Sequence, residues 1–148
     1  MNKPIAKLGK TESGEDLHYS AGAVIKNDKG EILLIDRATF PFGFACPAGH
    51  VDEGETAEVT VVREVKEETG LDVTKYELIR ESVTNVLANP CSKGVHHHYW
   101  YVYTCEVTGE VTRNLRETKS IGWYSPEEIR KLTLEPVWEY WFKELGII

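Results

Sequence analysis

The chain has 148 residues, the length of one ordinary globular domain, and its net charge is −7. Hydrophobic residues make up 41% of it and charged residues 28%, which is typical of a soluble protein, and no long apolar run predicts a membrane span. The negative charge argues against binding along a nucleic-acid backbone, which needs a basic surface. We therefore expect a single domain over residues 1–148, in which residues 1–16 form a polar lead-in or an edge strand.

The N-terminal segment and the cysteines both indicate a cytoplasmic protein. Residues 1–20 contain no apolar stretch of the kind found in secretory signals. Cys46, Cys91 and Cys105 are odd in number, widely spaced and free of any CxxC arrangement. That pattern predicts reduced thiols rather than disulfides or zinc ligands.

Two β-strands are predicted near the N-terminus. Residues 20–26 and 31–36 are rich in aliphatic side chains, and the Asn-Asp-Lys-Gly sequence of residues 27–30 predicts a hairpin turn between them. Residues 37–43 indicate a loop, because a proline and a glycine interrupt them. A short strand is expected at residues 44–46.

Residues 56–69 give the clearest helical pattern in the chain. Thr56 is a suitable N-cap, and Gly70 supplies a C-terminal stop. Apolar side chains at helical spacing form a stripe that we expect to pack on a sheet. This stripe consists of Ala57, Val61 and Val65, with Val62 beside it.

The C-terminal half is predicted to contain three strands and two helices. Strands are expected at residues 76–87, 97–107 and 121–124, and a helix is expected to begin at the capping-box sequence Ser-Pro-Glu-Glu of residues 125–128. A last helix over residues 136–145 has one apolar face, formed by Val137, Trp138, Trp141, Phe142 and Leu145. This order of elements predicts a mixed α/β sandwich of the α+β type.

Residues 49–71 carry the strongest functional signal. They hold seven acidic and two basic side chains, so a net charge of −5 out of the chain's −7 lies in this segment. On a helix, Glu64, Glu67 and Glu68 project from one flank, and an acidic pair at i,i+4 weakens a helix by a few tenths of a kcal/mol. A fold that accepts this repulsion most often has a cation to hold, and oxygen ligands favour Mg²⁺ or Mn²⁺ over zinc.

The same segment matches Gly-x5-Glu-x7-Arg-Glu-U-x-Glu-Glu-x-Gly-U, where U is apolar. The matching residues are Gly49, Glu55, Arg63, Glu64, Val65, Glu67, Glu68, Gly70 and Leu71. This pattern is the Nudix box, and the chain therefore resembles the Nudix hydrolase family. The box departs from the usual family pattern only in its approach, where Pro47-Ala48-Gly49 replaces Pro-Gly-Gly.

The resemblance implies a fold and a chemistry. The fold would be an α/β/α sandwich with a mixed central sheet, and the box would form a loop–helix–loop. The activity would be hydrolysis of a nucleoside diphosphate linked to a group X, with Mg²⁺ or Mn²⁺ as cofactor. The implied metal ligands are Glu64, Glu67, Glu68 and the Gly49 carbonyl, and Arg63 would orient Glu55 and the loop.

Two charged residues outside the box are further candidates. The family often places a basic residue near Arg37 against substrate phosphate, although a solvated arginine at a strand end is the alternative. Family members sometimes use a glutamate in the loop of Glu117 as a metal ligand or general base, and a plain surface acid is the alternative. The base therefore stays open among Glu64, Glu117 and a nearby histidine.

Histidine and aromatic residues complete the candidate set. In a strand, neighbouring side chains face opposite sides, so at most His96 and His98 of the His96–His98 run share a face. His98 could contact substrate or act as a base near neutral pH, and a partly exposed strand start is the alternative. Phe44 and Tyr99 are candidates for stacking on a base, and core packing is the alternative.

The resemblance leaves several functional alternatives. Some proteins with this box isomerise diphosphates or act on non-nucleotide diphosphates, and a binding module that only senses a nucleotide is a third class. The acidic charge favours a small nucleotide-diphosphate substrate over long RNA. Nothing in the sequence selects the group X, and either a monomer or a homodimer is expected.

Overall fold

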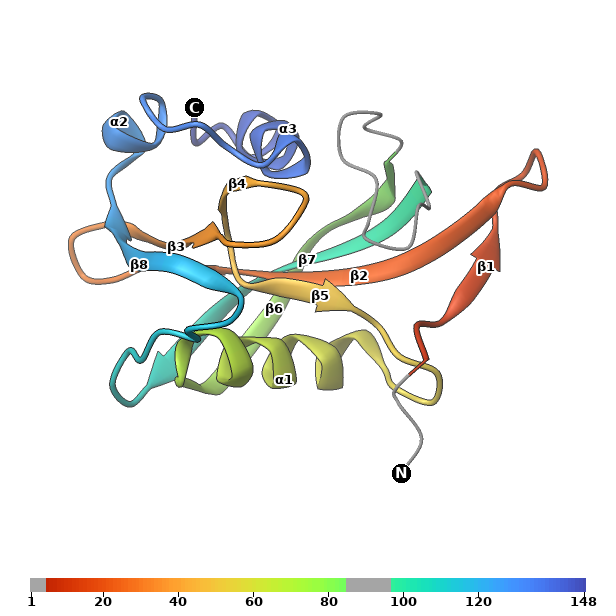
Figure 1. Ribbon diagram of the computed structural model, residues 1–148, viewed down its shortest axis with the longest axis horizontal. Helices are drawn as coiled ribbons and strands as arrows, with labels where there is room; N and C mark the ends of the chain where they lie inside the picture. Colours follow the sequence, from red (N-terminus) through yellow and green to blue (C-terminus); the bar gives the residue numbers. More distant parts are fainter. Residues whose placement is uncertain (1–4, 85–96) are drawn as a thin grey trace.

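The computed structural model describes residues 5–84 and 97–148 (Figure 1). In chain order, its elements are β1 (Leu8–Lys10), β2 (Asp16–Ile25), β3 (Ile32–Arg37), β4 (Gly43–Ala45), β5 (Ala48–His50), α1 (Ala57–Thr69), β6 (Asp72–Thr84), β7 (His97–Thr108), β8 (Thr118–Tyr124), α2 (Pro126–Ile129) and α3 (Pro136–Glu144). No helix in these two ranges is long and apolar enough to cross a membrane.

The strands form two sheets between layers of helices. The larger sheet has the order β1-β2-β7-β6, with β5 also paired to β2, and it is mixed because β2 and β7 run parallel while its other pairs are antiparallel. The second sheet is antiparallel, in the order β4-β3-β8. Helix α1 lies on one side, and α2 and α3 lie on the other (Figure 1). The predicted α/β/α sandwich with a mixed central sheet is confirmed, and the second sheet was not predicted.

The expected hairpin near the N-terminus is wrong beyond its turn. The turn forms, with the Gly30 N–H donating to the Asn27 carbonyl at 3.0 Å, but within the described part of the chain the Lys26–Ile32 bridge is the only β-pairing between the two predicted strands. After that bridge β2 joins the larger sheet and β3 the second one. Strand β3 is buried on both faces, because Leu33 packs on the α1 side and Leu34 on the α3 side.

Helix α1 begins and ends as its sequence predicts. The Thr56 side chain accepts the Val59 N–H at 3.3 Å, and Gly70 takes a left-handed conformation with φ 78°. Val61 and Val65 are fully buried against the larger sheet, whereas Val62 is 37% exposed and does not join the apolar stripe. The buried Val61 and Val65 therefore secure the position of the acidic flank.

Helix α3 closes the other core. Its predicted apolar face is buried, with Trp138, Trp141 and Phe142 at 0–1% exposure. Trp138 reaches Gly22 on β2 so closely that a Cβ at Gly22 would overlap its indole ring. A side chain at position 22 would therefore push α3 away from the sheet.

Other predictions concern the edges and the thiols. Strand β1 confirms the edge-strand alternative for the N-terminal segment, and β5 was not predicted. Cys46 and Cys105 are buried and free, whereas Cys91 lies outside the described residues.

Candidate active site

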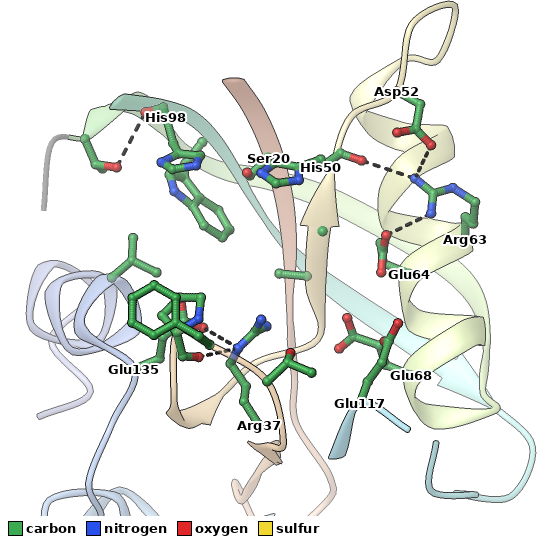
Figure 2. A pocket seen from close by; sticks show the side chains of 18 residues that line it. Ser20, Arg37, His50, Asp52, Arg63, Glu64, Glu68, His98, Glu117 and Glu135 are labelled. Atoms are coloured by element: carbon green, nitrogen blue, oxygen red, sulfur yellow. Dashed lines mark hydrogen bonds and ion pairs between the residues drawn. The ribbon is translucent and has the colours of Figure 1, made fainter. Parts of the chain in front are cut away.

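A cleft of about 360 Å³ opens where α1, β5 and the end of β3 meet (Figure 2). Among the described residues that line it are five acidic side chains and two arginines. Glu64 and Glu68 stand on the α1 side, Arg37 and Glu135 lie on another wall, and His50 and His98 lie along the edge formed by the larger sheet. The acidic excess gives the cleft a negative field that a cation would neutralise.

Arg63 on α1 holds the loop that precedes the helix. Its guanidinium pairs with both carboxylate oxygens of Glu55, each at 2.9 Å. It also lies 3.2 Å from the His50 carbonyl oxygen and 3.2 Å from the Asp52 carboxylate. A further bond to Glu64, at 2.8 Å, ties the same guanidinium to the acidic flank. One arginine therefore fixes the loop and orients a cleft carboxylate.

Glu55 is held in its ionised form. Besides Arg63, it accepts the Asp52 backbone N–H and the Thr60 hydroxyl, both at 3.0 Å. The hydrogen bonds from Arg63 are the main reason that the pKa of Glu55 falls from 4.5 to about 2. Its contribution to stability is therefore present above pH 4.5 and lost only as the pH falls toward 2. Glu55 is a structural acceptor rather than a candidate base near neutral pH.

Glu64 and Glu68 are buried acids whose charges oppose each other. Burial is the main reason that the pKa of Glu64 rises to about 7, with Glu67 adding to the rise and Arg63 opposing it. Burial and the charge of Glu64 also raise the pKa of Glu68. Within the described ranges, Glu68 Oε2 is buried and has no hydrogen-bonding partner. Such a carboxylate oxygen fits a divalent cation, which would stabilise both charges.

Gly49 on β5 makes room for this pair. A Cβ at Gly49 would overlap the carboxyl group of Glu64, so only glycine allows the present approach of β5 to α1. This packing places the Gly49 backbone beside the acidic flank. The oxygen-only donor set of two buried carboxylates and this backbone fits the Mg²⁺ or Mn²⁺ that the Nudix box implies.

Glu67 differs from the other two carboxylates of the flank. Its side chain is half exposed, it does not line the cleft, and it contacts Arg63 at 3.4 Å. It therefore lies on the solvent side of the same helical turn. A ligand role for Glu67 would need its side chain to turn toward Glu68.

Arg37 enters the cleft from the end of β3. A register irregularity between Asp36 and Arg37 interrupts the pairing with β8, and such bulges turn a side chain out of its regular direction. The Arg37 Nε donates to the Pro41 carbonyl at 2.6 Å and lies 3.6 Å from Glu135. Arg37 is thus held at the cleft wall with its other nitrogens toward the cavity (Figure 2).

Glu117 comes to the cleft on the loop before β8. Asn114 shapes that loop, because its Oδ1 accepts the backbone N–H of Glu117 at 3.2 Å while its Nδ2 donates to the Glu67 carbonyl of α1 at 3.3 Å. The negative charge of Glu117 contributes to the raised pKa of Glu68. The two carboxylates lie beside each other in Figure 2.

The two predicted aromatic contacts lie elsewhere. Tyr99 is on the face of β7 opposite to His98, where its hydroxyl donates to Glu81 at 3.0 Å. Phe44 packs against the α3 core and stands edge-on to Tyr124. Neither lines the cleft, whereas His98 does. His96 lies outside the described residues.

Sequence reasoning missed several residues of the site. His50, Asp52 and Glu135 line the cleft, and Asn114 positions Glu117. His50 directly follows the Gly49 of the box, and Asn114 stands three residues before Glu117, the spacing of a side-chain-capped turn. Those two local signals could have identified them. Glu135 had no such signal, because it reaches the cleft only through tertiary packing.

Comparison with known proteins agrees with the arrangement around α1. The family model of the NUDIX domain matches residues 16–145. The chain belongs to the NUDIX domain family. Among solved structures, this NUDIX protein is similar to the MutT protein from Methanosarcina mazei, with a TM-score of 0.69 and 26% identity over 86% of this chain and 91% of the other.

Curated relatives of this NUDIX protein have several activities in their names. The MutT-like protein of Streptomyces ambofaciens is 34% identical over 78% of this chain and 68% of its own length. The ADP-ribose pyrophosphatase of Methanocaldococcus jannaschii is 34% identical over 77% and 64%. The isopentenyl-diphosphate Delta-isomerase of Paenarthrobacter aurescens is 30% identical over 81% and 67%. The chain spans only 35–68% of the length of the first curated relatives that it matches.

Proposed function

We propose that this NUDIX protein is a Mg²⁺- or Mn²⁺-dependent pyrophosphohydrolase that acts on a small substrate in which a nucleoside diphosphate is linked to another group. The observation that carries the proposal is the pair of buried carboxylates, Glu64 and Glu68, at the wall of the cleft, with Glu68 Oε2 unbonded within the described residues. Relatives named as a pyrophosphatase and a diphosphatase support the same class of reaction.

The residues that would hold the metal ion are Glu64, Glu68, the Gly49 carbonyl and, after rotation of its side chain, Glu67. A divalent ion bound there would neutralise phosphate charge and lower the pKa of a bound water. The acidic excess of the cleft supports this requirement, because without a cation the cleft would repel a diphosphate.

The chain's own residues would do the rest. Arg63 holds Glu64 and the loop in place, so the Glu64 carboxylate does not need to reorganise when the substrate arrives. Arg37 would bind a phosphate oxygen through the nitrogens that Pro41 does not use. Glu117, beside Glu68, is our choice for the group that accepts the proton of the attacking water, because its fixed loop brings it to the cleft.

The decisive experiment is a screen of nucleotide substrates with Mg²⁺, in which the products are identified by mass. We expect release of a nucleoside monophosphate or of phosphate, abolished by EDTA and restored by Mg²⁺ or Mn²⁺. Glu67→Gln should lower kcat at least about tenfold, whereas Glu77→Gln on exposed β6 should leave it unchanged. Full activity in EDTA would refute the proposal.

The relative named as an isomerase favours one competing function. A product of unchanged mass with a shifted double bond would support isomerisation of a diphosphate, and binding without turnover would support a nucleotide sensor.

The ADP-ribose pyrophosphatase relative supports a nucleotide-linked substrate. We further propose that residues 1–148 act as one domain, as a monomer or homodimer in the cytoplasm.

A further inference from the structure

We propose that His18, His50 and His98 form a second cation site at the edge of the cleft, suited to a transition metal such as Zn²⁺ rather than to Mg²⁺. The site is separate from the carboxylates of α1 and does not depend on the proposed hydrolase activity. One nitrogen from each of the three imidazoles lies within 4.8 Å of the others. Among residues 5–84 and 97–148, this is the one group of three or more metal-ligating side chains whose ligand atoms lie this close together.

The sheet itself brings the three residues together. His18 on β2 and His98 on β7 are direct partners in the parallel pairing, so their side chains lie on the same face. His50 on β5 pairs with Ser20, two residues from His18, and therefore lies on that face as well. Three adjacent strands thus supply one imidazole each, and none of the three comes from an irregular loop.

The separations suit a shared ion after small rotations. The ring centroids are 5.0 Å apart for His18 and His50, 5.8 Å for His50 and His98, and 6.3 Å for His18 and His98. Nitrogen–zinc bonds of about 2.0–2.1 Å in a tetrahedral site put ring centroids about 5 Å apart. Small rotations of the rings about their side-chain bonds would bring the two larger centroid separations to about this value.

The position of the cluster indicates where a fourth ligand would bind. His18 and His98 are only 5% and 6% exposed, whereas His50 is partly exposed, and His50 and His98 line the cleft. Three histidines leave the fourth tetrahedral position open, as in zinc sites that bind water or a reactant. That position would face the cleft and accept an anionic oxygen, such as a phosphate oxygen of a bound molecule.

The two sites differ in chemistry although they share β5. Carboxylate and carbonyl oxygens suit Mg²⁺ and Mn²⁺, whereas imidazole suits zinc and its neighbours. Gly49 faces Glu64, and the next residue, His50, faces the imidazole cluster. A cleft with one hard and one borderline cation site could therefore hold two parts of an anionic substrate at once.

The test is metal binding by the tag-free protein, measured by equilibrium dialysis with elemental analysis. To remove the carboxylate site, the background carries Glu64→Gln and Glu68→Gln. We expect one Zn²⁺ per chain to bind in the presence of excess Mg²⁺, and Co²⁺ in place of Zn²⁺ to show the intense visible absorption of a tetrahedral site.

Ligand variants identify the donors. His50→Asn and His98→Asn should each weaken Zn²⁺ binding about 100-fold or more, beyond the 10–100-fold cost of losing an outer-shell partner. His97→Asn is the matched control, because His97 lies on the opposite face of β7, where it contacts Glu15. Circular dichroism and thermal unfolding check that each variant is folded. Because His50 is partly exposed, its substitution is the one that should disturb folding least.

Three results would overturn the proposal. The first is a background protein that binds no Zn²⁺, and the second is Zn²⁺ binding that is equal in folded His50→Asn, His98→Asn and His97→Asn. The third is stabilisation by inorganic phosphate that needs the histidines but no Zn²⁺, which would assign the cluster to direct anion binding. None of these outcomes depends on hydrolysis, so a failure here leaves the proposed hydrolase activity standing.

Discussion

A single missing side chain, that of Gly49, decides how close the Glu64 carboxyl group comes to β5. The overlap that a Cβ would cause is with the end of a flexible side chain rather than with backbone, and Gly49 does not have a positive φ. An alanine is therefore compatible with the fold, provided that Glu64 moves. Since Glu64 also bonds to Arg63, such a movement would disturb the acidic flank specifically.

The first prediction follows from this geometry. Gly49→Ala should reduce Mg²⁺ affinity and kcat at least about tenfold, while the melting temperature changes by no more than about 2–4 °C, which corresponds to roughly 1 kcal/mol. Steady-state kinetics and differential scanning calorimetry provide the two measurements. Gly122→Ala on β8 controls for the substitution itself, because Gly122 does not have a positive φ either and its Cβ would make only ordinary contact with Tyr124, at 3.4 Å. Normal kinetics in Gly49→Ala would show that the close approach has no role in metal binding.

Glu68 makes the opposite prediction for stability. Because burial and Glu64 raise its pKa, ionised Glu68 destabilises the folded metal-free protein as the pH rises above the ordinary value of 4.5. Glu68→Gln should therefore raise the melting temperature in EDTA at pH 8 by about 2–4 °C and lower activity strongly. The gain should shrink at pH 5, where the native carboxyl group keeps its proton.

Thermal unfolding of both proteins at the two pH values is the measurement for Glu68. Glu144→Gln on the exposed end of α3 is the control, and its melting temperature should match the wild type at both values. An unchanged or lowered melting temperature for Glu68→Gln at pH 8 would contradict a destabilising buried charge.

At the scale of elements, Arg63 connects α1 to the loop between β5 and the helix. Its planar guanidinium reaches Glu55 with two nitrogens and Glu64 with a third, a geometry that an ammonium group cannot reproduce. The loop has few other ties to the helix among the described residues, chiefly the Thr60 bond to Glu55. Loop order and ligand orientation therefore depend on the same side chain.

Arg63→Lys is the prediction at this scale. Charge is kept but the fork is lost, so we expect kcat to fall about 10–100-fold and the melting temperature to fall by a few degrees. Arg80→Lys on exposed β6 is a matched control that should change neither. Retention of full activity by Arg63→Lys would mean that the positive charge alone organises the loop.

The elements also show what the sequence could predict. The prediction of helix α1 and its caps was correct, because Thr56 and Gly70 act on neighbours a few residues away. The hairpin was wrong because the main partner of β2 is β7, about eighty residues further along the chain, and no local pattern identifies such a partner. The same distance hid His18 and Glu135, whereas the box residues Gly49, Arg63 and Glu64 belong to one segment and could be recognised together.

At the scale of the whole molecule, metal binding should be coupled to protons and to stability. The pKa of Glu64 is about 7, because the site is buried and already negative, so below that pH the pair holds a proton that a divalent ion must displace. As the pH rises through 7, the metal-free protein loses the stability that this proton provides. A bound ion would restore it, because ligands that bind only the folded state raise its stability.

Differential scanning calorimetry with and without Mg²⁺ tests this coupling. We expect Mg²⁺ to raise the melting temperature more at pH 8 than at pH 6. In EDTA, the metal-free protein should have a lower melting temperature at pH 8 than at pH 6. The Glu64→Gln variant should lose most of this pH dependence. If Mg²⁺ raised the melting temperature equally at both pH values, metal binding would not be coupled to the proton on Glu64.

Strand β5 is only three residues long, yet each of its faces belongs to a different cluster, Glu64 beside Gly49 and the imidazoles beside His50. Side chains alternate along a strand, so a shift of one position would exchange the two faces. Inserting or deleting one residue between β4 and β5 would place a side chain against Glu64 and turn His50 away from its partners. The length of this short connection is therefore expected to tolerate no change, even where its composition can vary.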